Sequence, residues 1–231
     1  MSSEHELVGV LRRNVGSARP VLPFDLRRLE PVVFDFTEGN RGLARVDLND
    51  TAGFADALFR EIEASGSPLG IGRYDEDRVV YRHSPLFDGR MERRSVHLGI
   101  DLFVEAETPV FSPFPGVVHS FCDNNNLGDY GPTVILEHEL SGVVFYTLYG
   151  HLSRASLDDQ VRRRRLAAGE QLGAVGGMHE NGSWPPHLHF QVIADMQGHE
   201  GDYPGVAMPS ERHRFLELCP DPNLILDLQG V

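Results

Sequence analysis

The stretch Ser183–Val192, "SWPPHLHFQV", places two histidines one residue apart inside an otherwise apolar run. Side chains of a β-strand alternate between its two faces, so the apolar residues of the run would share one face and His187 and His189 the other. The Cα atoms of the two histidines would lie ~6.6 Å apart, which lets both imidazoles reach one metal ion or one substrate atom. An H-x-H pair alone is more often two ordinary strand histidines, so a shared metal or substrate site needs support from the rest of the chain.

The chain around this stretch, residues 94–195, consists of short β-runs separated by glycine and proline. This texture predicts a mainly β fold, an antiparallel two-sheet sandwich or open barrel. Residues 1–93 are expected to form an N-terminal α/β extension, and residues 196–231 a C-terminal extension. The elements expected outside the core are a strand at Pro31–Phe36, a helix after a cap at Asn49 or Asp50, a hairpin from Gly70–Tyr74 and Val79–Tyr81, a helix at Ser210–Leu218 and a strand at Leu224–Leu228.

Composition restricts the function classes. With 41% hydrophobic and 24% charged residues the chain is typical of soluble globular proteins, and a net charge of −13 argues against nucleic acid as a partner. The sequence has no lysine, which excludes a Schiff base to pyridoxal phosphate and a lipoyl attachment site. No secretory signal and no apolar run of ~20 residues is seen, so we expect no membrane association and a cytoplasmic location. Cys122 and Cys219, the two cysteines, are expected to be reduced thiols.

A second histidine motif lies in "VHLGIDLF", with His97 and Asp101 four residues apart. On a flat strand the two residues share a face but lie ~13 Å apart, which is too far for one metal ion. If both bind one ion, the chain has to bend between them, and Gly99 allows a bulge or kink there.

A third piece, "YGHLS", puts His151 at the end of a strand. A zinc ion held by two imidazoles and a carboxylate keeps a fourth position for water and lowers the pKa of that water toward ~7. Two further imidazoles could then orient the water, take its proton and bind the oxyanion of a tetrahedral intermediate. The combination indicates hydrolysis.

The ordered set H-x-x-x-D, G-H-L and P-H-L-H-F resembles the lysostaphin-type (LytM-like) zinc metallopeptidases over about residues 94–192. This resemblance implies a two-sheet antiparallel β-fold with an open groove, a Zn²⁺ cofactor and a peptide or amide substrate. It also implies that His97, Asp101 and His189 bind the zinc ion, and that His151 and His187 are the catalytic histidines.

The loop before the H-x-H motif at His187 and His189 is longer and more polar than is usual in that family. It could line the substrate groove through His179, Glu180, Asn181 and Trp184, and Tyr149 is expected to border the same groove. The other histidines have no motif context and are expected to be structural or solvated; they are His5, His83, His119, His138, His199 and His213.

Two other functions remain open at this stage. A binding or regulatory module on the same scaffold typically lacks ligand residues, and none is missing here. A phosphoryl carrier with paired histidines would not need Asp101. The flanking segments "PGVAMPSER" and "CPDPNLIL" resemble the central module of fusion proteins that join a phosphotransferase, a lysostaphin-like domain and an aminotransferase. That resemblance implies a small-metabolite hydrolase that acts with such enzymes.

Overall fold

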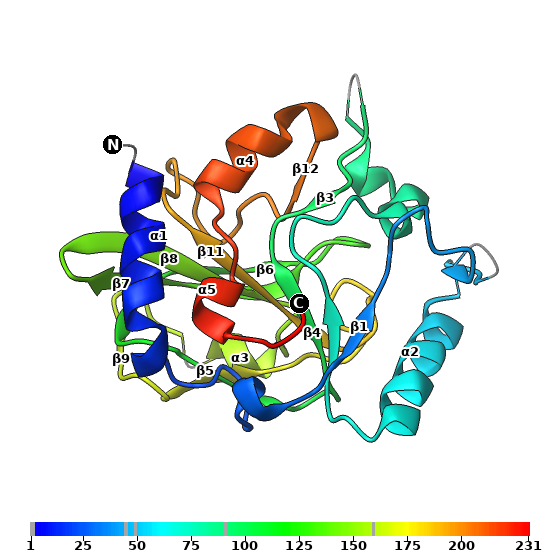
Figure 1. Cartoon of the computed structure of the whole chain (residues 1–231), viewed down its shortest axis with the longest axis horizontal. Coiled ribbons are helices and arrows are strands. Elements are labelled where there is room, and N and C mark those ends of the chain that lie inside the picture. Colours follow the sequence, from blue (N-terminus) through cyan, green and yellow to red (C-terminus); the bar gives the residue numbers. More distant parts are fainter. Residues whose placement is uncertain (1–2, 44–45, 49, 90–91, 159) are drawn as a thin grey trace.

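The computed structural model describes residues 3–43, 46–48, 50–89, 92–158 and 160–231 (Figure 1). Its strands are β1 (Val32–Phe34), β2 (Gly70–Gly72), β3 (Val96–His97), β4 (Ile100–Phe103), β5 (Pro109–Phe111), β6 (Gly116–Asn124), β7 (Gly131–Leu140), β8 (Val143–Gly150), β9 (Arg165–Leu166), β10 (Gln171–Ala174), β11 (His187–Ile193) and β12 (Val206–Ala207). Its α-helices are α1 (Ser3–Asn14), α2 (Thr51–Ser65), α3 (Ala155–Asp158), α4 (Arg212–Leu218) and α5 (Asn223–Leu226). Its 3-10 helices are η1 (Val15–Ser17), η2 (Leu26–Arg28), η4 (Val79–His83), η5 (Pro85–Phe87) and η6 (Pro209–Glu211).

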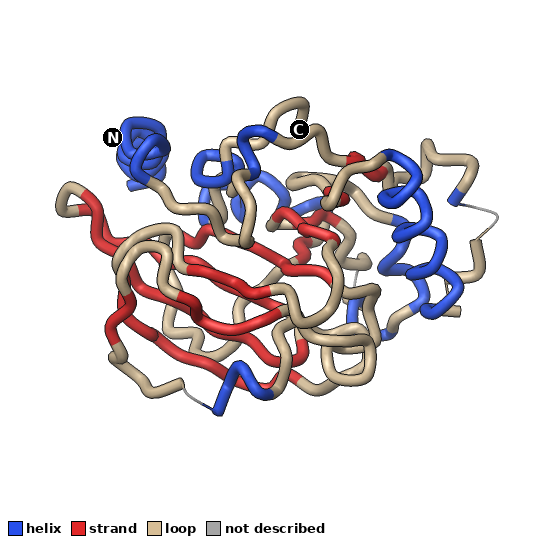
Figure 2. Tube along the Cα trace, turned by 90° about the horizontal axis from the view of Figure 1, so that it is seen from below, coloured by secondary structure: helices blue, strands red, loops and turns tan. Residues whose placement is uncertain are grey.

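One large sheet of eight strands organises the molecule, in the order β1-β2-β4-β11-β8-β7-β6-β9. Only β1 and β2 pair in parallel, and the other neighbours are antiparallel. Two small antiparallel pairs, β5 with β10 and β3 with β12, flank this sheet. Figure 2 shows the twisted strands together, with α1 and α2 at opposite ends of the molecule. The predicted mainly β, open architecture is confirmed.

Strand β11 is buried at all seven of its residues because β4 and β8 pair with its two edges and side chains cover both faces. Leu188, Phe190 and Val192 point into the largest apolar core with no exposed surface, as their alternation predicts. Burial of each such side chain contributes roughly 1.5–3 kcal/mol to folding. The histidines of the same strand therefore sit on a rigid element.

The N-terminal extension adds to this sheet. The predicted strand is β1, and the predicted helix is α2, which begins after Asp50, whose side chain accepts a hydrogen bond from the Gly53 amide. The alternative cap, Asn49, lies outside the described residues. Gly66 ends the helix in the left-handed conformation, with φ of 74°. Because β2 pairs with both β1 and β4, residues before 94 continue the sheet of the predicted core; the division at residue 93 stays a prediction.

Two predicted elements outside the core are wrong. The expected hairpin does not form, because β2 pairs with β1 and β4 while the second run is the 3-10 helix η4, whose Val79 amide donates to the Phe36 carbonyl. The expected strand at Leu224–Leu228 is the short helix α5. Apolar runs of this length show no clear period, so tertiary contacts select their conformation. The predicted helix near Ser210 is confirmed as η6 and α4.

No described helix combines the length and apolar character needed to cross a lipid bilayer.

Candidate metal centre

The register of β11 brings the predicted site residues together. His189 lies opposite Asp101 of β4 on one side and opposite Gly150, the last residue of β8, on the other. Strand pairing therefore carries Asp101 and the residue after β8, His151, to the two flanks of His189. Asp101 and His151 precede His189 by 88 and 38 positions in the chain, and strand pairing makes them its neighbours.

The chain bends between His97 and Asp101, as sharing one ion requires. β3 ends at His97 and pairs with β12, whereas β4 begins at Ile100 and pairs with β11 and β2. Gly99 lies in the bend, and a Cβ atom there would come within 2.6 Å of the His189 ring and 2.8 Å of the Phe190 carbonyl oxygen. Glycine is needed at position 99 because the His189 imidazole fills the space that a larger side chain there would occupy.

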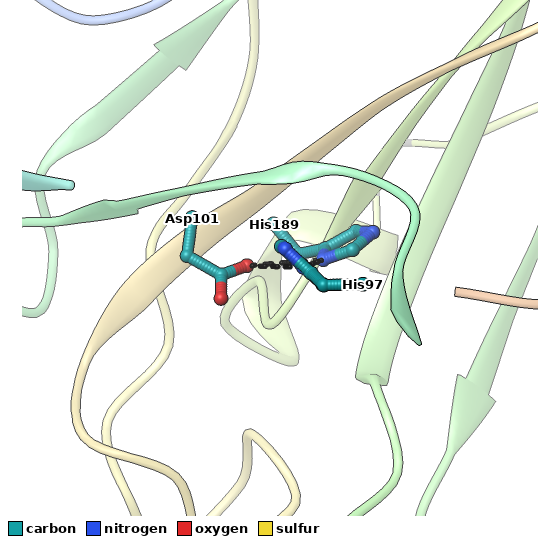
Figure 3. Close-up of side chains that lie close together, drawn as sticks. All are labelled: His97, Asp101 and His189. Atoms are coloured by element: carbon teal, nitrogen blue, oxygen red, sulfur yellow. Dashed lines mark hydrogen bonds and ion pairs between the residues drawn. The ribbon is translucent and has the colours of Figure 1, made fainter. Parts of the chain in front are cut away.

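Three donor atoms converge at this bend (Figure 3). His97 Nε2 and His189 Nδ1 lie 3.0 Å apart, and Asp101 Oδ1 lies 3.2 Å from the first and 3.0 Å from the second. Ligands that bind zinc tetrahedrally at ~2.0–2.1 Å are ~3.3 Å from one another, which is close to these separations. All three side chains are buried.

The hydrogen bonds on the far side of each ring determine which nitrogen of a neutral imidazole carries the lone pair. His97 Nδ1 donates to the Arg73 carbonyl oxygen at 2.8 Å, and His189 Nε2 donates to Gln191 Oε1 at 3.0 Å. An oxygen of this kind only accepts, so in neutral imidazoles the opposite nitrogens are unprotonated. Burial, followed by the charge of Arg78, lowers the pKa of His97 to about 4. In this neutral state the lone pairs of His97 Nε2 and His189 Nδ1 face one another, which is an arrangement suited to binding a metal cation.

A buried charge cluster surrounds the carboxylate. Asp101 Oδ2 accepts a hydrogen bond from Arg78 Nη1 at 2.6 Å, and Arg78 Nε donates to Glu76 Oε2 at 3.0 Å. Burial alone would raise the pKa of Asp101, but His97 and Arg78 hold it well below its usual range. Arg73 Nη1 also lies 3.5 Å from Glu76 Oε1, so the cluster pairs two carboxylates with two guanidiniums.

His151 and His187 lie beside the three donor atoms, with ring centroids 4.2 Å apart. His187 Nδ1 donates to the Pro185 carbonyl oxygen at 2.6 Å, and His151 Nδ1 donates to that of Asn181 at 2.8 Å. Burial lowers the pKa of both histidines, so both are neutral at pH 7 and keep a basic Nε2. His151 has a left-handed backbone, with φ of 62°, a conformation that is uncommon outside glycine and that recurs at functional sites.

The five residues of the three motifs line one cavity of about 220 Å³. Residues of the N-terminal extension, among them Phe36 and Phe54, line the same cavity, and so do Tyr203 and Val206 of the C-terminal extension. The resemblance implied an open groove. In this structure both extensions narrow the site to a pocket.

Of the residues predicted to line the groove, only Trp184 borders the cavity. The side chain of His179 is 80% exposed, away from it. Glu180 and Asn181 are buried and hold the loop: Glu180 accepts from the Arg154 amide at 2.8 Å, and Asn181 bonds both the amide and the carbonyl group of Trp184.

Tyr149 does not border the cavity, contrary to expectation. It lies in the apolar core with no exposed surface and packs against Phe190, its partner in the strand register, at a centroid distance of 5.4 Å. Alternation from His151 would put Tyr149 on the site face. That alternation stops at Gly150, because His151 lies beyond the strand in the left-handed conformation.

Sequence reasoning missed Arg78 and Tyr130, which border the cavity and contact the predicted ligands. The Tyr130 hydroxyl lies 3.4 Å from His189 Nε2 and donates to Gln191 Oε1 at 3.3 Å. Neither residue belongs to a short motif, so no local signal could have found them. His199, expected to be solvated, is exposed but also borders the cavity.

Comparisons with known proteins agree with the motifs. Residues 95–201 match the family model of peptidase family M23. No curated protein matches the chain. Among solved structures, a zinc-containing peptidase from Vibrio cholerae is 26% identical over 47% of this chain and 31% of its own, with a TM-score of 0.35. The chain thus spans about a third of that protein's length.

Two other structures illustrate the range of similarity. The catalytic domain of the antimicrobial peptidase lysostaphin from Staphylococcus simulans is 24% identical and covers 50% of this chain and 77% of its own, with a TM-score of 0.38. A variant catalytic domain of the prophage-encoded protein EnpA from Enterococcus faecalis is 21% identical and covers 58% and 86%, with a TM-score of 0.40. The segment that matches peptidase family M23, residues 95–201, includes all three ordered motifs.

Proposed function

We propose that this chain is a zinc-dependent peptidase or amidase. The observation that carries the proposal is the convergence of His97 Nε2, His189 Nδ1 and Asp101 Oδ1, within 3.2 Å of one another, in the wall of a cavity. Two imidazoles and one carboxylate are the ligand set of several hydrolytic zinc sites. A zinc ion held there would supply a Lewis acid and lower the pKa of a water molecule.

The chain's own residues supply the proton transfers. We assign this role to His151 and His187, which are neutral and present Nε2 lone pairs beside the three donor atoms. Such a nitrogen can accept a proton from the attacking water and return it to the leaving amine. The other neutral imidazole can accept a hydrogen bond from the attacking water through its Nε2 and so orient that water. The carbonyl oxygens of Asn181 and Pro185 fix both rings in the required tautomer.

The experiment measures metal and turnover together. The purified chain, stripped with chelator and supplied with zinc, is expected to bind about one zinc per chain and to cleave members of a panel of short peptides, detected by mass spectrometry. The stripped protein should be inactive, and zinc should restore it. A protein that takes up no zinc, or that binds zinc and cleaves no peptide or amide on the panel, would contradict the proposal and favour a binding role for the scaffold.

A further inference from the structure

Aromatic residues line one side of the cavity in two sets. The Tyr81 ring contacts those of Phe87, at a centroid distance of 4.5 Å, and Trp184, at 6.1 Å. Phe36 and Phe54 form the other set, with centroids 6.1 Å apart, and the Arg78 guanidinium lies over both Phe36 and Tyr81. Four of these five residues come from the N-terminal extension, outside the segment that matches the family. We call Phe36, Phe54, Tyr81, Phe87 and Trp184 the aromatic wall; each lines the cavity.

The aromatic wall reaches the proposed catalytic histidines. Phe103, which also lines the cavity, stacks on His187 with centroids 5.0 Å apart and lies 5.9 Å from Phe36. An apolar group held against the wall would therefore lie next to the amide bond whose cleavage His187 is proposed to assist.

The charge of Arg78 on this side of the cavity is already paired within the protein. Arg78 lies over the Phe36 ring at 5.1 Å, and its guanidinium is bonded to Asp101 and Glu76. Arg94 lies over the Phe87 ring at 5.6 Å and donates to the Leu86 carbonyl oxygen. A neutral apolar group suits this surface better than a carboxylate, because it requires no desolvation of a charge.

The volume of the cavity sets the size of the ligand. An apolar protein cavity of ~150 Å³ is large enough to bind benzene. The present cavity, of about 220 Å³, has room for one phenyl-sized group and the adjoining amide. A second large side chain would have to remain outside it.

We propose that the aromatic wall is a specificity subsite, which takes one aromatic or large aliphatic side chain next to the amide bond that is cleaved. The proposal rests on the proposed hydrolase function for the identity of that bond. A glycine at this position of a substrate would leave the subsite empty.

The binding test uses Trp184, the single tryptophan of the chain, whose emission reports on the cavity. The zinc-loaded protein is titrated with N-acetylphenylalaninamide and with N-acetylglycinamide, with excitation at a wavelength that only tryptophan absorbs. We expect a saturable change in emission with the phenyl probe and at least ten-fold weaker binding of the glycine probe. Equal affinities for the two probes would overturn the proposal.

Matched variants on one helix locate the effect. Phe54 of α2 lines the cavity, whereas Phe59 of the same helix packs on the same apolar cluster outside it. Phe54→Ala should weaken the phenyl probe at least ten-fold, Phe54→Leu less, and Phe59→Ala should bind like the wild type. Phe54→Leu keeps most of the buried volume and serves if Phe54→Ala does not fold. Wild-type affinity in Phe54→Leu and Phe54→Ala alike would contradict a subsite at the wall.

A cleavage assay distinguishes failure of the subsite from failure of the proposed function. The zinc enzyme is given peptides that differ only in whether phenylalanine or glycine flanks each amide, and kcat/KM is compared. A ten-fold or larger preference for phenylalanine that Phe54→Ala reduces supports both proposals. Equal cleavage of both peptides refutes the subsite and keeps the hydrolase. Selective binding of the phenyl probe without cleavage of any peptide keeps the subsite and refutes the hydrolase.

Discussion

His138 of β7 differs from the buried histidines of the cavity in one respect that decides their chemistry. It is as buried as His97, His151, His187 and His189, and burial lowers its pKa to about 4. Both of its ring nitrogens have protein partners, the Pro115 carbonyl oxygen at 3.0 Å and the Thr147 hydroxyl at 2.7 Å. His97 and His189 each donate to an oxygen through one ring nitrogen, while their other nitrogens converge on one another and on the Asp101 carboxylate. Burial and a lowered pKa do not make a metal site; convergent lone pairs do.

The largest effect that tests this difference is loss of the metal. His189→Ala is expected to reduce zinc from about one ion per chain to none, because it removes one of three protein ligands. His138→Ala removes an equally buried imidazole of the same sheet and should leave zinc content unchanged. Elemental analysis of the purified proteins measures both. One zinc per chain in His189→Ala would show that the convergence in Figure 3 is not the metal site.

The next effect separates the two pairs of histidines within the cavity. His187→Ala should keep zinc and lose turnover by a factor on the order of 10²–10⁴, the usual contribution of a general acid–base group. His151→Ala should behave in the same way. His213→Ala, whose side chain is 95% exposed on α4, is the control and should match the wild type. If His151→Ala or His187→Ala released the metal, the proposed division between ligands and catalytic residues would be wrong.

A pH titration of stability tests the fully paired histidine. The folded-state pKa of His138, about 4 because of burial, is below the ordinary value of 6.5, so the unfolded chain takes up the proton first as the pH falls. Stability from this group is present above pH 6.5 and is lost as the pH falls toward 4, by up to about 3 kcal/mol. In chelator, the unfolding free energy of His138→Phe should therefore decline less between pH 6.5 and 4 than that of the wild type. Parallel declines would contradict a neutral, buried His138.

The smallest effect concerns the outer hydrogen bonds of the two groups. Gln191→Met removes the acceptor for His189 Nε2 and should weaken zinc binding about 10- to 100-fold, because that bond orients the ring. Thr147→Val removes the corresponding partner of His138 and should leave the zinc affinity unchanged. A competition titration with a zinc indicator measures both affinities. Equal affinities for zinc in the two variants would mean that the outer bond does not orient His189.

The sequence predicts more of the candidate site than of the residues that surround it. The H-x-H pattern predicts that His187 and His189 share a face, and β11 has that alternation. The required bend at Gly99 follows from the length of an extended strand alone, and the structure has it. These inferences succeed because strand geometry fixes distances over a few residues.

The surroundings depend on contacts between distant segments. Arg78 reaches Asp101 from 23 positions earlier in the chain, and Phe54 faces a cavity whose motifs begin 43 positions later. Nothing local marks Arg78 as buried, since arginine is usually exposed. Tyr149 shows the converse: it was expected to border the groove, but the chain turns into the left-handed conformation at His151 and Tyr149 lies in the apolar core.

The short β-runs, the ordered motifs and the composition, all read from the sequence, were enough to predict a mainly β fold, the group of five candidate site residues and the absence of lysine chemistry. Strand register, the tautomers of His97, His151, His187 and His189, and the aromatic wall required the folded chain. The reason is physical: residue type and short spacing specify which atoms can bind or transfer a proton, whereas the packing of remote segments specifies which of those atoms lose their water and meet.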